Sequence, residues 1–168
     1  MKILSSLLVS VVAFSSPALA FTSFKDAMNQ SRLLDSVQDS GTSVIYNPSD
    51  CKDRPGLHGY YATTRNTQGE YLRDEMGLCL GNHQTLSQLN NTVRHEAIHV
   101  AQECNGGPIL PMEYWLPKLS EQTKHYLQGY DLKDLPYEVE AWHSAEVLTN
   151  QQVDVILRQY CELDWTLH

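Results

Sequence analysis

The stretch between Thr85 and Gly106 constrains the fold more than any other part of the chain, because it carries the start and stop signals of one long helix. Thr85 and Gln88 have the spacing of a capping box, in which each side chain satisfies a backbone N–H group at the helix start. The run Asn105-Gly106-Gly107-Pro108 predicts a helix end near Cys104. Apolar residues recur at helical spacing in between, at Leu86, Leu89, Val93 and Val100. We therefore expect a long helix with one buried face.

The middle of this helix carries the motif His95-Glu96-Ala97-Ile98-His99. Residues four apart stand on one face of a helix, so His95 and His99 can present imidazole nitrogens to one metal ion. Zinc binds neutral histidine, and two such ligands leave room for a third protein ligand and a water. Glu96 is offset by about 100 degrees around the helix, which places it beside the ion. There it would act as the general base toward a zinc-bound water, so the motif predicts a zinc-dependent hydrolase.

A second helix, expected from Asp134 through Leu148, offers two candidates for the third ligand. Glu138 shares its predicted buried stripe with four apolar residues, Ala141, Trp142, Ala145 and Leu148. Glu140 falls on the side that is predicted to be wetter, together with Ser144, Val147 and Gln151. A lone carboxylate on an apolar face is costly unless it is paired or coordinated, and zinc would remove that cost. We therefore predict Glu138 as the third ligand, with Glu140 as the alternative.

The order of these motifs resembles the gluzincin branch of the zincin metallopeptidases, especially its minimal single-domain members, the minigluzincins. The resemblance consists of H-E-x-x-H followed by a downstream helix with E-x-x-A, and it covers roughly residues 76 to 148. The metzincin pattern is excluded, because it needs a glycine and a histidine where this chain has Gln102 and Asn105. The resemblance implies that zinc is the cofactor, bound by His95, His99 and Glu138, that Glu96 is the general base, and that a peptide or protein is the substrate.

The resemblance also implies two features around the metal. An edge strand of a small sheet, here Met76 to Leu80, would pair with an extended substrate peptide. A Tyr or His side chain would stabilise the oxyanion of the tetrahedral intermediate. The sequence offers five candidates for this role without ranking them: His125, Tyr126, Tyr130, Tyr137 and His143.

The rest of the chain predicts an α+β fold. A helix is expected over 22–39, strands over 42–46, 58–64, 70–73 and 76–80, an irregular loop over 109–118, and helices over 119–128, 134–148 and 151–163. The two strands around Asn66-Thr67-Gln68-Gly69 read as a hairpin. We therefore expect a small antiparallel sheet packed on a helical half, zincin-like, with the H-E-x-x-H motif on a long central helix.

The first twenty residues have the composition of a signal peptide. Lys2 precedes an apolar run over 3–14, and Ala18-Leu19-Ala20 is a typical cleavage signal. We expect cleavage after Ala20, a single domain over 21–168 with no membrane anchor, and an exported protein that is periplasmic or secreted. The net charge of −8 becomes −9 without this segment, which argues against nucleic acid as a partner, and we expect a monomer.

Four cysteines lie beyond this segment, and in an oxidising compartment an even count indicates two disulfides. Three pairings are possible, and we favour Cys51–Cys79 with Cys104–Cys161, which would tie the strand region to itself and join the ends of the helical half. A zinc cluster built from these cysteines is disfavoured, because the chain has no C-x-x-C pair.

Two other interpretations stay open at the level of sequence. The segment before the motif faintly resembles peptide deformylases, in which a cysteine, here Cys79, would be the third ligand of a metal amidase. Alternatively, the chain is a non-catalytic, disulfide-stapled binding module. Glu96 speaks against the binding module, because a structural metal site needs no base directly after its first histidine.

Overall fold

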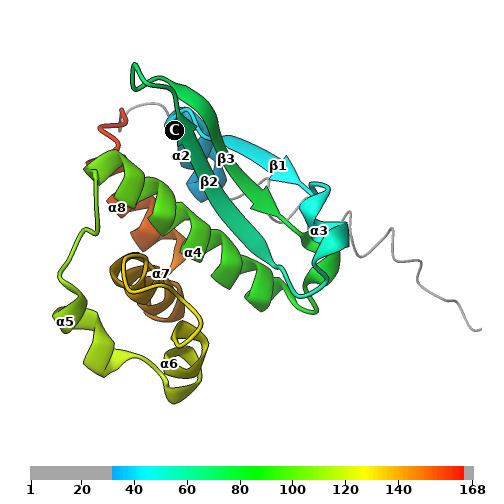
Figure 1. Ribbon diagram of the computed structural model, residues 1–168, viewed down its shortest axis with the longest axis vertical. Coiled ribbons are helices and arrows are strands. Elements are labelled where there is room, and N and C mark those ends of the chain that lie inside the picture. Colours follow the sequence, from blue (N-terminus) through cyan, green and yellow to red (C-terminus); the bar gives the residue numbers. More distant parts are fainter. Residues whose placement is uncertain (1–31, 165–168) are drawn as a thin grey trace, which may run out of the picture.

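The long capped helix lies at the centre of the fold. Helix α4 (Leu86–Asn105) runs between a three-stranded sheet on one side and helices α7 (Leu135–Val147) and α8 (Asn150–Tyr160) on the other (Figure 1). Both halves of the predicted capping box form, because Thr85 accepts from the backbone N–H of Gln88 and Gln88 reaches back to Thr85. Gly106 ends the helix in the left-handed conformation, with φ of 73°. The sequence prediction for this helix is confirmed.

The computed structural model describes residues 32–164. The predicted signal peptide lies outside the described residues, as does the first part of the helix expected over 22–39. The remainder of that helix is α2 (Arg32–Asp39), which packs against α8 and the first strand. Within residues 32–164, no helix has the length and apolar composition that a membrane span requires.

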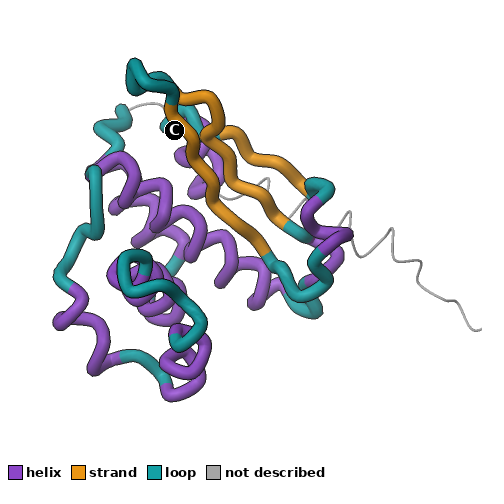
Figure 2. The backbone as a smooth tube through the Cα atoms, in the orientation of Figure 1, coloured by secondary structure: helices purple, strands orange, loops and turns teal. Residues whose placement is uncertain are grey.

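The sheet is mixed, which corrects the predicted antiparallel sheet. Its strands are β1 (Ser43–Tyr46), β2 (Gly59–Arg65) and β3 (Tyr71–Leu78), in the order β1-β3-β2 (Figure 2). Strands β2 and β3 form the predicted hairpin and are antiparallel, whereas β1 pairs with β3 in parallel. The parallel pair needs a crossover connection. The chain from β1 to β3 supplies it through the short helix α3 (Asp50–Asp53) and through β2.

Residues 76–80 do not form an edge strand, so that prediction is wrong. Residues 76–78 continue β3, which is the central strand and has a neighbour on each side. Met76 and Leu78 are completely buried in the core cluster that also contains residues of α4 and α2, and they are followed by the short 3-10 helix η1 (Leu80–Asn82). The edge strand next to α4 is instead β2.

The main core fills the space between the sheet, α4 and the helices α2 and α8. Its buried members include Leu33, Val37, Met76, Leu78, Leu89, Val93, Ala97, Val100, Ala101, Val153 and Leu157. A smaller cluster under the helical half joins Leu119, Leu127 and Val139, with Trp142 packed against it. Because α4 contributes to the main core along most of its length, core packing fixes the position of this helix beside β2.

The segment expected as an irregular loop over 109–118 is helical in part, which corrects that prediction. It contains α5 (Met112–Trp115) and the 3-10 helix η2 (Leu116–Lys118), followed by α6 (Glu121–Leu127). Pro111 stands directly before α5, where its fixed φ favours a helix start, and its carbonyl accepts from the N–H of Tyr114. The segment from Gly106 to Asp134 therefore leaves the end of α4 and returns to the start of α7 through short helices (Figure 1).

The predicted disulfide pairing is confirmed. Cys51 of α3 is bonded to Cys79 at the end of β3, and Cys104 near the end of α4 is bonded to Cys161, the residue after α8. All four cysteines of the chain are used in these two bonds. Two disulfides agree with a secreted or extracellular protein.

Candidate metal centre

The two histidines of the motif meet on the face of α4 that does not enter the main core. Their Nε2 atoms lie 3.1 Å apart, and their ring centroids are separated by 4.8 Å. His95 is buried and His99 is partly buried. Two neutral imidazoles that point their Nε2 atoms at one spot are the arrangement expected of a metal ligand pair.

Helix α7 brings the carboxylate of Glu138 to the same spot. Its Oε2 lies 3.4 Å from His95 Nε2, and its Oε1 lies 3.5 Å from His99 Nε2. The three side chains are drawn from two helices far apart in the sequence, and α4 and α7 pack closely along this face. Buried Ala141, one turn after Glu138, is small enough to permit the approach, as the sequence suggested.

The spacing of the three ligand side chains is compatible with a zinc ion. Ligand atoms that lie 2.0–2.1 Å from a tetrahedral ion are separated by about 3.3–3.4 Å. Here the two Nε2 atoms are 3.1 Å apart, His95 Nε2 lies 3.4 Å from Glu138 Oε2, and His99 Nε2 lies 3.5 Å from the other oxygen, Oε1. Glu138 Oε2 is buried and makes no hydrogen bond of normal geometry with any described residue. A buried carboxylate oxygen without a donor is costly, and a cation at the centre of the three groups would remove that cost.

Glu96 stands beside the three ligand atoms. One ligand atom from each of His95, Glu96 and His99 lies within 4.8 Å of the other two, so Glu96 is near enough to be considered as a ligand itself. We assign Glu138 to the ligand set because its oxygens lie closer to both Nε2 atoms. The Glu96 carboxylate instead accepts a hydrogen bond from the backbone N–H of Tyr61 in the edge strand β2.

Burial and the mutual charges shift the pKa values of all four groups in the metal-free protein. Burial raises the pKa of Glu96 to about 7, and the charge of Glu138 acts in the same direction. Burial and the neighbouring His95 lower the pKa of His99 to about 4, so this histidine is neutral. Burial lowers the pKa of His95, but contact with Glu138 and the charge of Glu96 outweigh it, so the net direction is upward. Burial opposes ionisation of Glu138, yet contact with both histidines lowers its pKa overall.

Glu140 is more buried than Glu138, which corrects the predicted order of their exposure. Glu140 is 2 % exposed, whereas the Glu138 side chain is 16 % exposed. The prediction failed because the segment after α4 folds over this side of α7, where the backbone N–H groups of Ile109 and Leu110 donate to the Glu140 carboxylate. A third donor is the side-chain amide of Gln102. Glu140 therefore has three donors and is not placed to bind the ion in the described arrangement.

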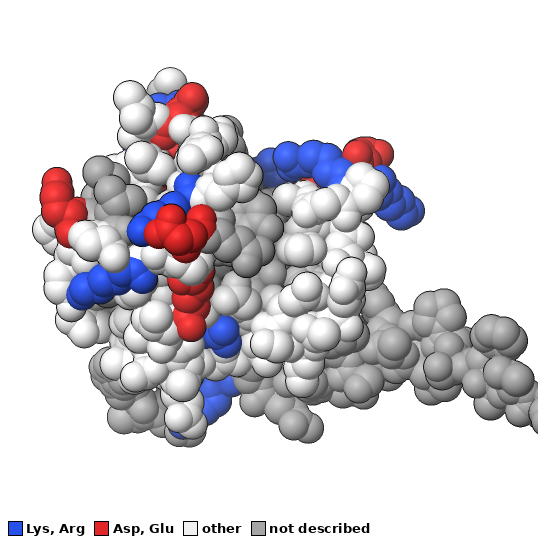
Figure 3. Space-filling view, turned by 90° about the horizontal axis from the view of Figure 1, so that it is seen from below, with Lys and Arg blue, Asp and Glu red and all other residues white. Residues whose placement is uncertain are grey.

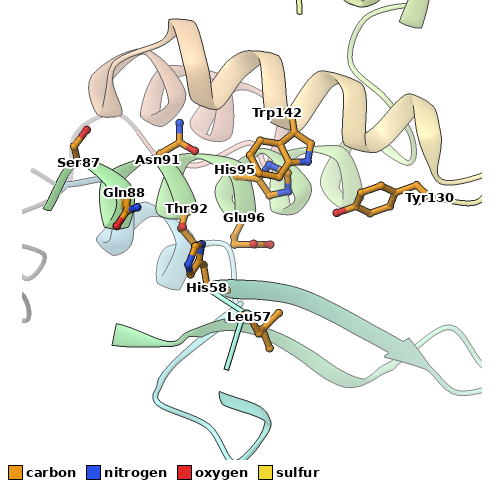
Figure 4. A pocket seen from close by; sticks show the side chains of 12 residues that line it. Leu57, His58, Ser87, Gln88, Asn91, Thr92, His95, Glu96, Tyr130 and Trp142 are labelled. Carbon is orange, nitrogen blue, oxygen red and sulfur yellow. The ribbon is translucent and has the colours of Figure 1, made fainter. Parts of the chain in front are cut away.

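Two clefts open onto the centre. The larger, of about 700 Å³, reaches His95 and Glu96 (Figure 4), and the smaller, of about 480 Å³, reaches His99 and Glu138. Edge strand β2 contributes to both clefts, with Gly59 in the larger and Tyr61 in the smaller. The wall of the larger cleft also includes Leu57 and Trp142 and several polar side chains, namely Ser87, Gln88, Asn91, Thr92 and His58.

Among the five oxyanion candidates, the structure brings Tyr130 into the larger cleft. Its hydroxyl points into the cleft toward the side that His95 and Glu96 occupy (Figure 4). Burial and the charge of Glu138 raise its pKa to about 12, so it stays protonated as a donor. Tyr137 lines the smaller cleft, His143 is buried, and His125 is exposed on α6. The side chain of Tyr126 lies outside the described part of the chain.

Sequence reasoning missed two contributors to the centre. Gln102 follows His99 by three residues on the same face of α4, and this spacing is a signal that could have found it. Gly59 allows β2 to approach Thr92 and Glu96 closely, and a glycine within a strand is the corresponding signal. Cys79 is bonded to Cys51, so it is not the free thiolate ligand that the deformylase-like interpretation requires.

The fold and site together define an α+β domain with a largely buried His-His-Glu cluster on two packed helices. Residues 21–162 match the family described as Domain of unknown function (DUF8637), and the chain belongs to this family. No curated protein and no solved structure matches the chain.

Proposed function

We propose that the chain is an exported zinc-dependent metallopeptidase of the zincin type, similar to the gluzincin branch. The observation that carries the proposal is the convergence of His95 Nε2, His99 Nε2 and the Glu138 carboxylate. The two nitrogens lie 3.1 Å apart, and one carboxylate oxygen lies 3.4 Å from His95 while the other lies 3.5 Å from His99. These three residues would hold the ion, with Glu96 beside it. When bound, zinc would supply a Lewis acid that polarises a peptide carbonyl and acidifies a water molecule.

Glu96 is suited to the role of general base. A pKa raised to about 7 means that both protonation states are accessible near neutral pH, which favours proton transfer in both directions. The backbone of Tyr61 in β2 faces this carboxylate and favours its ionised form, which partly offsets the effect of burial. In the proposed reaction, Glu96 takes a proton from the attacking water and passes it to the leaving amine.

Tyr130 is our choice for the oxyanion donor. Its hydroxyl enters the cleft from the segment between α6 and α7, on the far side from β2 (Figure 4). A donor aimed at the place where negative charge develops stabilises the transition state. Because its pKa is raised to about 12, this hydroxyl keeps its proton throughout the range in which Glu96 titrates.

A peptide is the substrate class that the clefts fit. Both clefts follow β2, whose outer edge is unpaired in the described sheet, and an extended chain can lie along such an edge. Acidic and basic side chains are interspersed on the face shown in Figure 3. A test therefore needs peptides of every charge. We further propose cleavage of the signal segment after Ala20 and a periplasmic or secreted location, which the two disulfides support.

The test uses the protein purified after export of the full-length chain. Wild type and Glu96→Gln are loaded with zinc and incubated with a diverse peptide mixture, and the products are read by mass spectrometry. Glu96→Gln is the matched control, because it removes the base but leaves all three proposed ligands in place.

We expect wild type to bind one zinc ion per chain and to cut peptides, and we expect chelation or Glu96→Gln to abolish cutting. A folded wild type that binds no zinc would overturn the proposal. Zinc bound equally by both proteins, with no peptide cut by either, would instead favour a non-catalytic binding module.

A further inference from the structure

We propose that Gln102 and Glu140 are positioning residues: they fix the tautomer and ring orientation of His99 and tie this ligand to the chain segment that follows α4. The expected effect on zinc binding rests on the proposed function, whereas the hydrogen bonds themselves involve only protein atoms. All of the contacts involved are hydrogen bonds between described residues.

The orientation of the Gln102 amide follows from its surroundings. Its Nε2 lies 2.9 Å from Glu140 Oε2 and 3.0 Å from the carbonyl oxygen of Tyr137. Both of these partners accept hydrogen bonds, so the group facing them must be the NH₂ of the amide. The carbonyl oxygen of the amide is therefore the atom that faces His99. Gln102 is 1 % exposed, so water has little access to compete with these bonds.

The tautomer of His99 follows in turn. His99 Nδ1 lies 2.8 Å from Gln102 Oε1, an acceptor, so Nδ1 must carry the proton. In a neutral imidazole the other nitrogen then has the free lone pair. That atom is Nε2, which lies 3.1 Å from His95 Nε2 and 3.5 Å from Glu138 Oε1. Gln102 thus presents His99 to the centre in the only neutral form that can bind a cation there.

Glu140 holds the amide in this orientation. Its carboxylate accepts from the backbone N–H groups of Ile109 and Leu110, both at 2.8 Å, and from Gln102. Only a group that accepts at both oxygens can satisfy three donors that converge on it. Ile109 and Leu110 lie near the start of the segment between α4 and α7, which also carries Tyr130. The buried Glu140 carboxylate therefore connects this segment, through Gln102, to the proposed ligand His99.

Glu140→Gln is a nearly isosteric change that replaces one acceptor oxygen of this carboxylate with an NH₂ group. The substituted side chain would have one NH₂ group among three N–H donors, so at least one donor would face another donor. If the new NH₂ stands in the place of Oε1, it faces the N–H of Leu110 and Gln102 keeps its orientation. If it stands in the place of Oε2, it faces both the N–H of Ile109 and the Gln102 NH₂. A half-turn of the Gln102 amide then removes the second of these conflicts, but it presents the Gln102 NH₂ to His99 and the Gln102 oxygen to the Tyr137 carbonyl. His99 must then accept at Nδ1 and carry its proton on Nε2, where it blocks metal binding.

The decisive measurement is the tautomer of His99 in the metal-free protein, read by long-range ¹⁵N–¹H NMR of its imidazole after export of the full-length chain. We expect the Nδ1–H form in wild type and both tautomers in Gln102→Met, in which no acceptor faces Nδ1. Zinc affinity, measured by competition with a chelator, should fall by about 10- to 100-fold in Gln102→Met. Glu140→Gln is the second variant, in case Gln102→Met fails to fold, and it should shift part of the population toward the Nε2–H form.

Asp154→Asn is the matched control. Asp154 is a largely buried carboxylate, paired with Arg158 of α8 at 3.2 Å, so its loss should lower stability without touching His99. The proposal is overturned if folded Gln102→Met keeps the Nδ1–H tautomer and wild-type zinc affinity, or if wild type itself has the Nε2–H form. If wild type shows the Nδ1–H form but binds no zinc, the proposed function fails, while the role of Gln102 in fixing the tautomer of His99 stands.

Discussion

The indole ring of Trp142 packs edge-on against the imidazole of His95, with ring centroids 4.8 Å apart and planes inclined by 61°. His95 Nδ1 is buried and has no hydrogen-bond partner among the described residues, in contrast to His99, which Gln102 anchors. Ring packing therefore takes the place of a hydrogen bond in orienting His95. The two histidines of the centre are held by different kinds of contact.

From this contrast we predict the behaviour of two Trp142 variants. Trp142→Ala leaves the His95 ring free to rotate and should weaken zinc binding by about 10-fold, comparable to the loss of a supporting contact to a ligand. Trp142→Phe keeps an aromatic edge against the imidazole and should stay close to wild type. Chelator competition measures both. Equal zinc affinity of Trp142→Ala and wild type would show that the α4 backbone alone orients His95.

Gly59 permits the close contact between β2 and α4. A methyl group there would lie 2.6 Å from Thr92 Cγ2 and 3.3 Å from Glu96 Cγ. We predict that Gly59→Ala costs about 1–3 kcal/mol of unfolding free energy and lowers kcat, because β2 moves away from the base that it orients. Gly56→Ala, in the same cleft wall but with open space around it, should be neutral.

A second substitution tests whether the clash with Thr92 causes the loss of stability in Gly59→Ala. Thr92→Ser removes the Cγ2 atom but keeps the hydroxyl that lies 3.0 Å from His83 Nε2. Placed in the Gly59→Ala background, it should recover part of the lost stability in urea unfolding. If it recovers nothing, the clash with Thr92 is not the source of the loss.

The raised pKa of Glu96 predicts that ionisation of this side chain destabilises the folded, metal-free protein. Its folded pKa of about 7 exceeds the ordinary value of 4.5, so the folded state binds more protons than the unfolded state between these values, and this contribution to stability falls as pH rises. Glu96→Gln mimics the protonated form and keeps an acceptor for Tyr61. At pH 8 it should be more stable than wild type by about 3 kcal/mol, with the difference vanishing below pH 4.5. A difference that is independent of pH would contradict the assignment.

Tyr130→Phe separates transition-state stabilisation from binding. Removing one donor to the oxyanion should lower kcat by about 10²- to 10³-fold with little change in KM or in zinc affinity. Tyr137→Phe, a tyrosine of the other cleft, is the matched control and should keep most of the activity. A large loss in Tyr137→Phe but not in Tyr130→Phe would exchange the two roles.

The features predicted correctly from the sequence are those determined by local chemistry. Thr85 and Gln88 mark the start of α4, and Asn66 to Gly69 mark a hairpin turn, because caps and turns depend on residues only a few positions apart. The convergence of His95 and His99 follows from helical spacing alone. The choice of Glu138 followed from its neighbours on α7, and this carboxylate does lie beside both histidines.

The features that were missed depend on parts of the chain far apart in sequence. The parallel pairing of β1 with β3 is set by the crossover through α3 and β2, which strand propensity does not encode. Glu140 looked like the wetter carboxylate because it shares its side of α7 with Ser144 and Val147. Its observed partners include the backbone N–H groups of Ile109 and Leu110. Every residue except proline has a backbone N–H group, so the sequence pattern could not indicate which of these groups would donate to Glu140.

The chemistry of the cysteines separates two steps in the maturation of the protein. The side chains gathered at the centre contain no sulfur, since every cysteine of the chain is bonded to another cysteine. Thiolate ligands must be reduced and deprotonated before they bind a metal, whereas imidazole and carboxylate ligands need no reduction. Oxidative folding and metal loading therefore do not compete for the same atoms. Oxidants that eject zinc from thiolate sites would find no sulfur to attack among these ligands, so metal retention should be insensitive to oxidising conditions.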